Sequence, residues 1–360
     1  MSFAQSPAKQ RAVRDFTLNI LSAFLGDMHR LEKDNYDAAR YSADGVDRSM
    51  TFETLRHAFC LQAFVAQQAA FFEAWQKLQD EDSKKLFLNL LRFNLAGHLH
   101  VRLPTRDPAY FGQTDCLCDL EVSPTKLNLP GDFHHYSFLW NGTPVKLDGV
   151  LADCLWKYAH RQYFYDRGGV RIAPEHGDHV IDAGACLGDT CLALAQAVGP
   201  KGWVYAFDVL EPHLAACRHN FAQNEGLAQF KLFDKGLSDK VCEASPSGTA
   251  PQAVNPGFSL IGQEACAFAT TTIDRLVQKG EIERVDFIKM DIEGSEMAAL
   301  RGAEQTLRRF KPKLAISAYH IFTHYFEIIL FLDSLGLGYR FYVDHYTIHN
   351  EETVIYAVAG

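Results

Sequence analysis

The 360 residues carry a formal net charge of -9, which provides no basic surface for nucleic acid or for an anionic membrane. The length is that of about two domains, and an apolar fraction of 48% suffices for buried cores. No apolar run approaches the ~20 residues of a membrane span, and the first residues lack a signal-peptide core. We therefore expect a cytoplasmic protein that does not bind nucleic acid.

The cysteines and histidines do not predict a metal site. Nine cysteines in a chain of this length fit free thiols in a reducing compartment. Cys116 and Cys118 form a C-x-C pair, and His98 and His100 form an H-x-H pair. No second pair stands at metal-ligand spacing, so we expect no bound metal.

Residues 1 to about 100 have the pattern of helices. One helix is predicted from Phe52, capped by Thr51, and a second from Lys84 to His100. Large apolar residues follow the first helix with mostly helical spacing: Phe52, Leu55, Phe59, Phe64, Phe71, Trp75 and Leu78. Such a stripe could be a platform for a sugar or an acyl group, but we favour burial in a core or in a homodimer interface.

The middle of the chain predicts a small β-rich connection. Prolines interrupt residues 104–144, and a strand pair is expected over 132–140 and 144–149, followed by a linking helix over 154–163. We divide the chain into residues 1–150, an N-terminal helical region with this connection, and residues 151–360, a catalytic domain. Ala244 to Gly262, rich in Pro, Gly and Ser, is either a lid over the substrate or a long surface loop.

The segment His179–Thr190 predicts the opening of a parallel α/β sheet. A short apolar strand ends in Asp182, and Gly184 and Gly188 precede a helix of small and apolar residues. Ligands of such sheets bind at the carboxyl ends of the strands. The glycines allow close approach of the backbone to a ligand, and the helix start offers unpaired N–H groups.

The spacing of this segment disfavours a nicotinamide dehydrogenase. A dinucleotide site would show G-x-G-x-x-G, whereas here the glycines are four apart and position 186 is Cys. Asp182 stands before the glycines, where it would repel a pyrophosphate. An acid there suits a ligand with cationic and hydroxyl donors, such as S-adenosylmethionine with its α-ammonium group and two ribose hydroxyls.

Three later apolar strands also end in polar residues. The strand over 203–207 leads to Asp208, and a carboxylate there can accept hydrogen bonds from both ribose hydroxyls. The strand over 230–233 leads to Gly236–Asp239, and the strand over 285–290 leads to Asp291–Glu296. These polar groups should converge on one edge of the sheet.

Four motifs in this order resemble the FkbM-type family of S-adenosylmethionine-dependent methyltransferases. They are V-I-D-A-G-A-x-x-G-D-T, V-Y-A-F-D, T-T-T-I-D-R-L and F-I-K-M-D-I-E-G-S-E-M-A-A-L-R-G-A, and the similarity covers roughly residues 170–360. The resemblance implies an α/β, Rossmann-like class I methyltransferase domain with a seven-stranded sheet that a C-terminal hairpin closes. Family members usually show Glu-Pro directly after the second strand, whereas this chain has D-V-L-E-P. Alignment by strand end selects Asp208, which we favour, and alignment by the Glu-Pro pair selects Glu211.

Site residues follow from these motifs. The predicted cofactor-binding residues are Asp182, Gly184, Ala185, Gly188, Asp189, Thr190, Asp208, Glu211, Ser238, Asp239 and Asp291. A hydroxyl substrate gains from a positioned base, and His320, after the strand K-L-A-I-S-A-Y, is our candidate; Asp291 and Glu293 compete for the role. Glu296 is interpreted as a residue of a helix first turn, where an acid meets the helix dipole favourably.

The expected function is methyl transfer from S-adenosylmethionine to a hydroxyl of a sugar or glycan intermediate, as the resemblance implies. One alternative is an O-methyltransferase of a polyketide or peptide natural product. Another is a non-catalytic, cofactor-binding scaffold, against which the complete set of strand-end acids argues.

Overall fold

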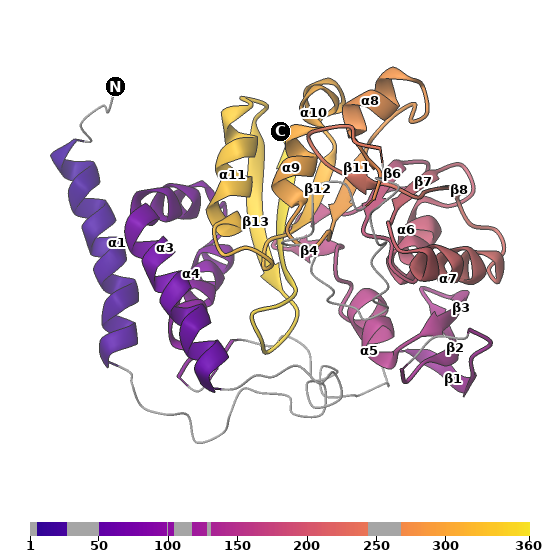
Figure 1. Cartoon of the computed structure of the whole chain (residues 1–360), viewed down its shortest axis with the longest axis horizontal. Coiled ribbons are helices and arrows are strands. Elements are labelled where there is room, and N and C mark those ends of the chain that lie inside the picture. The colour runs from indigo at the N-terminus through magenta and orange to yellow at the C-terminus, as the bar shows by residue number, and fades with distance from the viewer. Residues whose placement is uncertain (1–5, 27–49, 99, 104–116, 128–130, 244–267) are drawn as a thin grey trace. The chain divides into compact units, whose positions relative to one another are not determined.

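The computed structural model describes residues 6–26, 50–98, 100–103, 117–127, 131–243 and 268–360 (Figure 1). These residues group into two compact units, one of residues 1–106 with 318–355, the other of residues 107–317 with 356–360. The predicted domain boundary near residue 150 stays a prediction. Ala244 to Gly262, the predicted lid or loop, and Cys116 lie outside the described residues.

The described part of the first unit contains the N-terminal helices α1(Pro7–Gly26), α3(Met50–Lys77) and α4(Glu81–Ala96), which lie side by side in Figure 1. The predicted second helix starts earlier than expected because Asp80 caps it, accepting from the Ser83 N–H at 2.6 Å. It ends at Ala96 because Gly97 takes a φ of 82°. The same unit contains α11(His324–Ser334) and β13(Tyr339–His345).

The aromatic stripe of α3 is buried only in part. Phe64 and Phe71 are fully buried, and the Phe71 ring lies 5.0 Å from Phe322 and 4.7 Å from Phe326 of α11. Phe59, by contrast, is 68% exposed. The stripe therefore serves mainly as core of this unit, and a homodimer through these helices stays a prediction.

The second unit holds five parallel strands of the main sheet. They are β6(His179–Ala183), β7(Trp203–Phe207), β8(Gln229–Phe233), β11(Phe287–Met290) and β12(Lys313–Ser317). The strand order of the whole seven-stranded sheet is β13-β14-β12-β11-β6-β7-β8, where β14 is Thr353–Ala359. This mixed sheet, with the last strand inserted beside β12, is the class I methyltransferase arrangement that the sequence predicts.

Helices follow the strands of this unit in turn. They are α6(Asp189–Val198) after β6, α7(Glu211–Ala222) after β7, α8(Ile273–Gln278), and α9(Glu296–Arg301) and α10(Glu304–Phe310) between β11 and β12. Two short pairs, β4(Tyr165–Arg167) with β5(Val170–Ile172) and β9(Gly236–Leu237) with β10(Thr270–Thr271), also belong to this unit. None of the helices among the described residues combines the length and apolar character needed to cross a lipid bilayer.

The connection before the main sheet differs from its prediction in two ways. The expected strand pair is present as β2(His134–Trp140) and β3(Thr143–Gly149), but β1(Cys118–Pro124) adds a third strand on β2. The expected helix over 154–163 is instead a short α-helix, α5(Leu151–Cys154), and one π-helical turn, η2(Leu155–Ala159). The helix does not continue because Arg161 and Tyr163 adopt left-handed φ values of 56° and 73°.

Gly184 gives a stability test of the sheet's central turn. A Cβ on Gly184, whose φ is 82°, would lie 1.9 Å from the Asp291 carbonyl oxygen, whereas Gly177 has a φ of 87° and open space around it. Gly177→Ala should cost roughly 1–2 kcal/mol for the left-handed conformation alone. Gly184→Ala should cost more than roughly 4 kcal/mol, measured by urea unfolding. Equal costs for the two variants would contradict this packing.

Candidate active site

Strand register brings the predicted polar residues to one level. Ala183 pairs with Phe207 and with Met290, and Met290 pairs in turn with Ile316. The next residues along the four strands are therefore neighbours at the carboxyl edge of the sheet: Gly184, Asp208, Asp291 and Ser317. The convergence predicted from the apolar strand patterns is present in the structure.

The glycine loop, residues 184–188, is a tight turn between β6 and α6. The N–H groups of Gly184 and Ala185 both donate to the Phe207 carbonyl, at 3.0 and 2.9 Å. Gly188 has a φ of 87°, and a Cβ there would lie 3.0 Å from Cys217 of α7. The two glycines thus allow close packing on Asp291 and on α7, in addition to any approach to a ligand.

A buried ion pair lies beneath the glycine loop. Lys289 Nζ lies 2.9 Å from Asp182 Oδ1, and both side chains are almost completely buried. The same ammonium group donates to the carbonyls of Gly184 at 2.7 Å and Ala183 at 3.2 Å. Burial by itself would lower the pKa of Lys289, but the carboxylates of Asp182 and Asp291 hold it above its ordinary value. Lys289 is therefore a cation that ties β11 to the start of the loop.

Asp182 has protein partners on both carboxylate oxygens. Oδ1 pairs with Lys289, and Oδ2 accepts from the Cys191 thiol at 3.0 Å. The side chain is 0% exposed. Its predicted contact with a ligand stays a prediction, but its present partners suit a role in holding the loop.

Asp208 is bound to the glycine loop from the neighbouring strand. Its Oδ2 accepts from the Cys186 N–H at 2.9 Å, and its Oδ1 accepts from the Val209 and Leu210 N–H groups. His213 Nδ1 also lies 3.3 Å from Oδ1 and 3.4 Å from Oδ2, so the roughly four lone-pair sites of this carboxylate all have protein partners, and a ribose hydroxyl would share or replace the His213 contact. Glu211, the competing acid, is 74% exposed and pairs with Arg218 on the surface of α7.

The start of α6 and the turn after β9 contain four further predicted residues. Asp189 and Thr190 are buried in the first turn of α6, where the helix leaves N–H groups without helical partners. Tyr158 supports this turn, because its hydroxyl donates to the Asp189 carbonyl at 3.0 Å. Ser238 donates its N–H to the Thr271 carbonyl, and the Asp239 side chain is exposed.

The segment after β11 places its three acids differently. Asp291 Oδ2 accepts from the Tyr163 hydroxyl at 2.9 Å. Glu293 has a left-handed φ of 53°, which marks the sharp turn there. Glu296 is fully buried, and its Oε1 accepts from the N–H groups of Ile292 at 2.9 Å and Gly294 at 3.4 Å. Glu296 closes the turn that leads into α9, in agreement with its interpretation as a helix-start residue.

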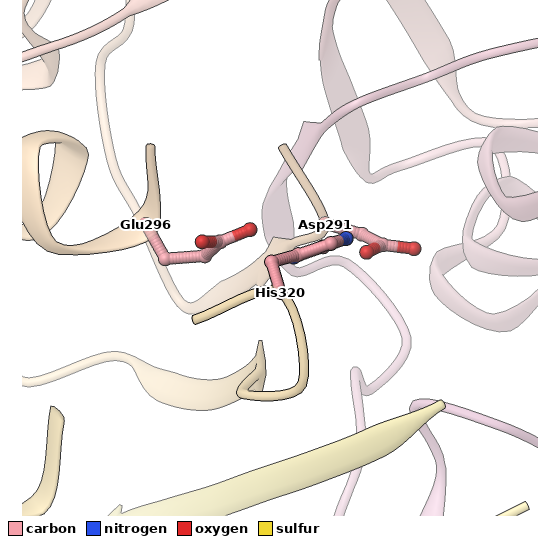
Figure 2. Close-up of side chains that lie close together, drawn as sticks. All are labelled: Asp291, Glu296 and His320. Atoms are coloured by element: carbon pink, nitrogen blue, oxygen red, sulfur yellow. The ribbon is translucent and has the colours of Figure 1, made fainter. Parts of the chain in front are cut away.

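His320 follows β12 by three residues, so chain connectivity keeps it within about 10 Å of Ser317. Figure 2 shows the side chains of Asp291, Glu296 and His320 close together. Carboxylates and an imidazole are ligand types that a divalent metal ion can use, and no other such group occurs among the described residues. Because Asp291 and Glu296 already accept hydrogen bonds from the protein, the expectation of no metal stays our prediction.

Two residues at this site were not identified from the sequence. Lys289 stands inside the buried strand F-I-K-M, and a charge in such a strand signals a buried partner, although not which one. Tyr163 gave no signal, because its left-handed φ of 73° and its bond to Asp291 depend on tertiary structure.

Comparison with known proteins agrees with this architecture. Residues 182–341 match the family model of the methyltransferase FkbM domain. The sheet order and the loop at its carboxyl edge define a class I methyltransferase fold. The chain therefore contains a methyltransferase FkbM domain, and the family resemblance of its motifs is confirmed.

Solved structures similar to the chain are distant in sequence. A methyltransferase FkbM from Methylobacillus flagellatus is 20% identical with a TM-score of 0.49, over 82% of this chain and 60% of that one. Fibrillarin from Aeropyrum pernix, solved with natively bound S-adenosyl-L-methionine, is 13% identical with a TM-score of 0.34, over 67% of this chain and 100% of that one. The chain thus spans about 60% of the Methylobacillus protein. No curated protein matches the sequence.

Removal of Lys289 tests the ion pair under the loop. Lys289→Met leaves the Asp182 carboxylate buried without a counter-charge, so it should destabilise the fold by about 3–5 kcal/mol in urea unfolding. Lys313→Met on the neighbouring strand is the control, since Lys313 pairs with the exposed Glu175 and should change stability by about 1 kcal/mol or less. A Lys289→Met cost no greater than that of the control would refute the assigned role.

Proposed function

We propose that the chain transfers the methyl group of S-adenosylmethionine to a hydroxyl group of a sugar or glycan intermediate. The methyltransferase FkbM domain at residues 182–341 supports methyl transfer as the class of reaction. The observation that carries the cofactor assignment is the carboxylate of Asp208 beside the glycine loop, bonded to the Cys186 N–H at 2.9 Å. The hydroxyl of a sugar as substrate rests on the family resemblance.

The residues at the sheet edge fit S-adenosylmethionine. In this proposal Asp208 accepts from the ribose hydroxyls, the glycine loop and the first turn of α6 surround the methionine end, and Ser238 and Asp239 lie near the adenine. A carboxylate is a suitable acceptor for the two hydroxyls of a ribose, and the longest of its present contacts, to His213 at 3.3 and 3.4 Å, is the one that a hydroxyl would replace. Bound there, the cofactor supplies a methyl group already activated on sulfur, so the protein has only to align the substrate and accept a proton.

Calorimetry can decide between the two candidate acids. Asp208→Ala should weaken S-adenosylmethionine binding by at most roughly 1.5–3 kcal/mol for each charge-assisted hydrogen bond lost. Glu211→Ala should leave binding nearly unchanged, because that side chain is 74% exposed and paired with Arg218. If only the Glu211 variant loses affinity, the alignment by strand end is wrong.

His320 is our proposed general base for the substrate hydroxyl. Its position three residues after β12 brings it to the carboxyl edge of the sheet, and an imidazole is suited to proton transfer near neutral pH. Asp291 is less suited, because its Oδ2 already accepts from the Tyr163 hydroxyl, and Glu293 lies in the strained turn that follows. A competing role for His320 is to orient the substrate without taking its proton.

Two substitutions of His320 separate these roles. For a base, His320→Ala and His320→Gln should both lower kcat by roughly 10²–10⁴-fold and leave cofactor affinity unchanged. The assay uses S-adenosylmethionine with a labelled methyl group and the sugar that accepts the label. Glutamine can form hydrogen bonds but cannot accept a proton near neutral pH. Recovery of kcat in the Gln variant would therefore show that His320 orients the substrate instead.

The alternatives are distinguished by the fate of the label. Transfer only to a polyketide or peptide would favour the natural-product O-methyltransferase. Binding of S-adenosylmethionine without transfer to any substrate would favour the non-catalytic scaffold. A homodimer and a cytoplasmic location stay parts of the proposal.

A further inference from the structure

The outer edge of the small three-stranded sheet is completed by two asparagine side chains. β3 pairs with β2 along one edge only, and alternate residues of a strand direct their N–H and C=O groups to the same edge. On the other edge, the Asn224 carboxamide accepts from the Lys146 N–H at 2.9 Å and donates to the Lys146 carbonyl at 2.8 Å. The Asn220 carboxamide does the same with Asp148, at 2.7 and 2.8 Å.

Asn220 makes one contact that Asn224 does not. Its Nδ2 also donates to the carbonyl of Leu187, at 2.8 Å, and Leu187 lies inside the glycine loop. Asn220 is 0% exposed, and its Oδ1 also accepts from Gln223 at 3.3 Å, so every hydrogen-bonding position of the amide is used. Asn224 instead donates to the Asn220 carbonyl, at 2.8 Å.

A buried carboxylate strengthens the attachment of the small sheet to α7. The Asp148 side chain is 1% exposed and accepts hydrogen bonds from Thr125, His135, His219 and Gln223. Burial by itself would raise the pKa of Asp148, but these four donors lower it to about 2. Thr125 directly follows β1 and His135 lies in β2, whereas His219 lies in α7 and Gln223 directly follows it. The Asp148 carboxylate therefore joins the small sheet to α7.

An apolar cluster also holds Leu187 of the glycine loop. Phe133, directly before β2, packs with Leu187 and Ala216 of α7, and all three are buried. The loop is thus held on one side by the Phe207 carbonyl and on the other by Asn220 and Phe133. Figure 1 shows the small sheet beside α7.

We infer that Asn220 is a positioning residue of the cofactor site, through which the small sheet fixes the glycine loop by its hydrogen bond to Leu187. The inference rests on the proposed binding of S-adenosylmethionine at this loop. The bond from Asn220 acts on the Leu187 carbonyl, whereas Phe207, Asp208 and Lys289 bind other groups of the loop. Misplacing a positioned group by about 1 Å can cost an enzyme up to roughly 10²-fold in activity, so the orientation of the loop's peptide groups matters for the site.

Asn220→Ala and Asn224→Ala form a matched pair for the test. Each removes one carboxamide that pairs with the N–H and C=O of a β3 residue, but only the first removes the bond to the loop. Binding of S-adenosylhomocysteine is measured by calorimetry well below the unfolding temperature of each variant. Asn220→Ala should weaken binding roughly 10- to 100-fold, and Asn224→Ala should change it less than about 2-fold.

Amide hydrogen exchange of the wild-type chain gives an independent readout if Asn220→Ala does not fold. On addition of S-adenosylhomocysteine, exchange of the Asp148 N–H, bonded to Asn220, should slow together with the loop amides. The Lys146 N–H, bonded to Asn224, should change less. Unchanged exchange at Asp148, or equal loss of affinity in the two alanine variants, would overturn the inference. Failure of the wild type to bind S-adenosylhomocysteine would instead count against the proposed function.

Discussion

The ion pair between Lys289 and Asp182 is the interaction on which the active edge of the sheet depends. It joins β11 to β6 at the level where both strands end, and the same ammonium group binds the carbonyls of Ala183 and Gly184. The direction of the glycine loop as it leaves β6 follows from these three bonds. Because both charges are removed from water, either one alone would be costly, which couples the stability of the domain to the geometry of its site.

Each side of the glycine loop is held by a different part of the fold. The Asp291 backbone packs so closely against Gly184 that a Cβ there would clash with it, and the Asp208 carboxylate accepts a hydrogen bond from the Cys186 N–H. The Asn220 carboxamide accepts from the Asp148 N–H of β3 and donates to the Leu187 carbonyl of the loop. The small sheet, which has no strand in the main sheet, is thereby part of the structure that shapes the proposed cofactor site.

The sequence alone predicted the parallel strands and the acids at their ends, because short apolar runs that stop at Asp or Gly have a direct physical meaning. It favoured Asp208 over Glu211 as the ribose-binding acid by strand end, and that choice stays a prediction. It did not predict β1 or the partner of Lys289, and Asn220 resembles any polar residue on a helix surface. These features depend on which segments meet in space, and hydrophobic periodicity carries no such information.

Photochemical labelling tests the central claim most directly, namely that S-adenosylmethionine binds at the carboxyl edge between β6 and β7. The full chain is irradiated with radiolabelled S-adenosylmethionine, with and without excess S-adenosylhomocysteine, and the labelled peptides are identified by mass spectrometry. Our account predicts competable label in peptides that contain residues 184–190 or Asp208. Label confined to residues 50–98, or label that the competitor does not reduce, would contradict it.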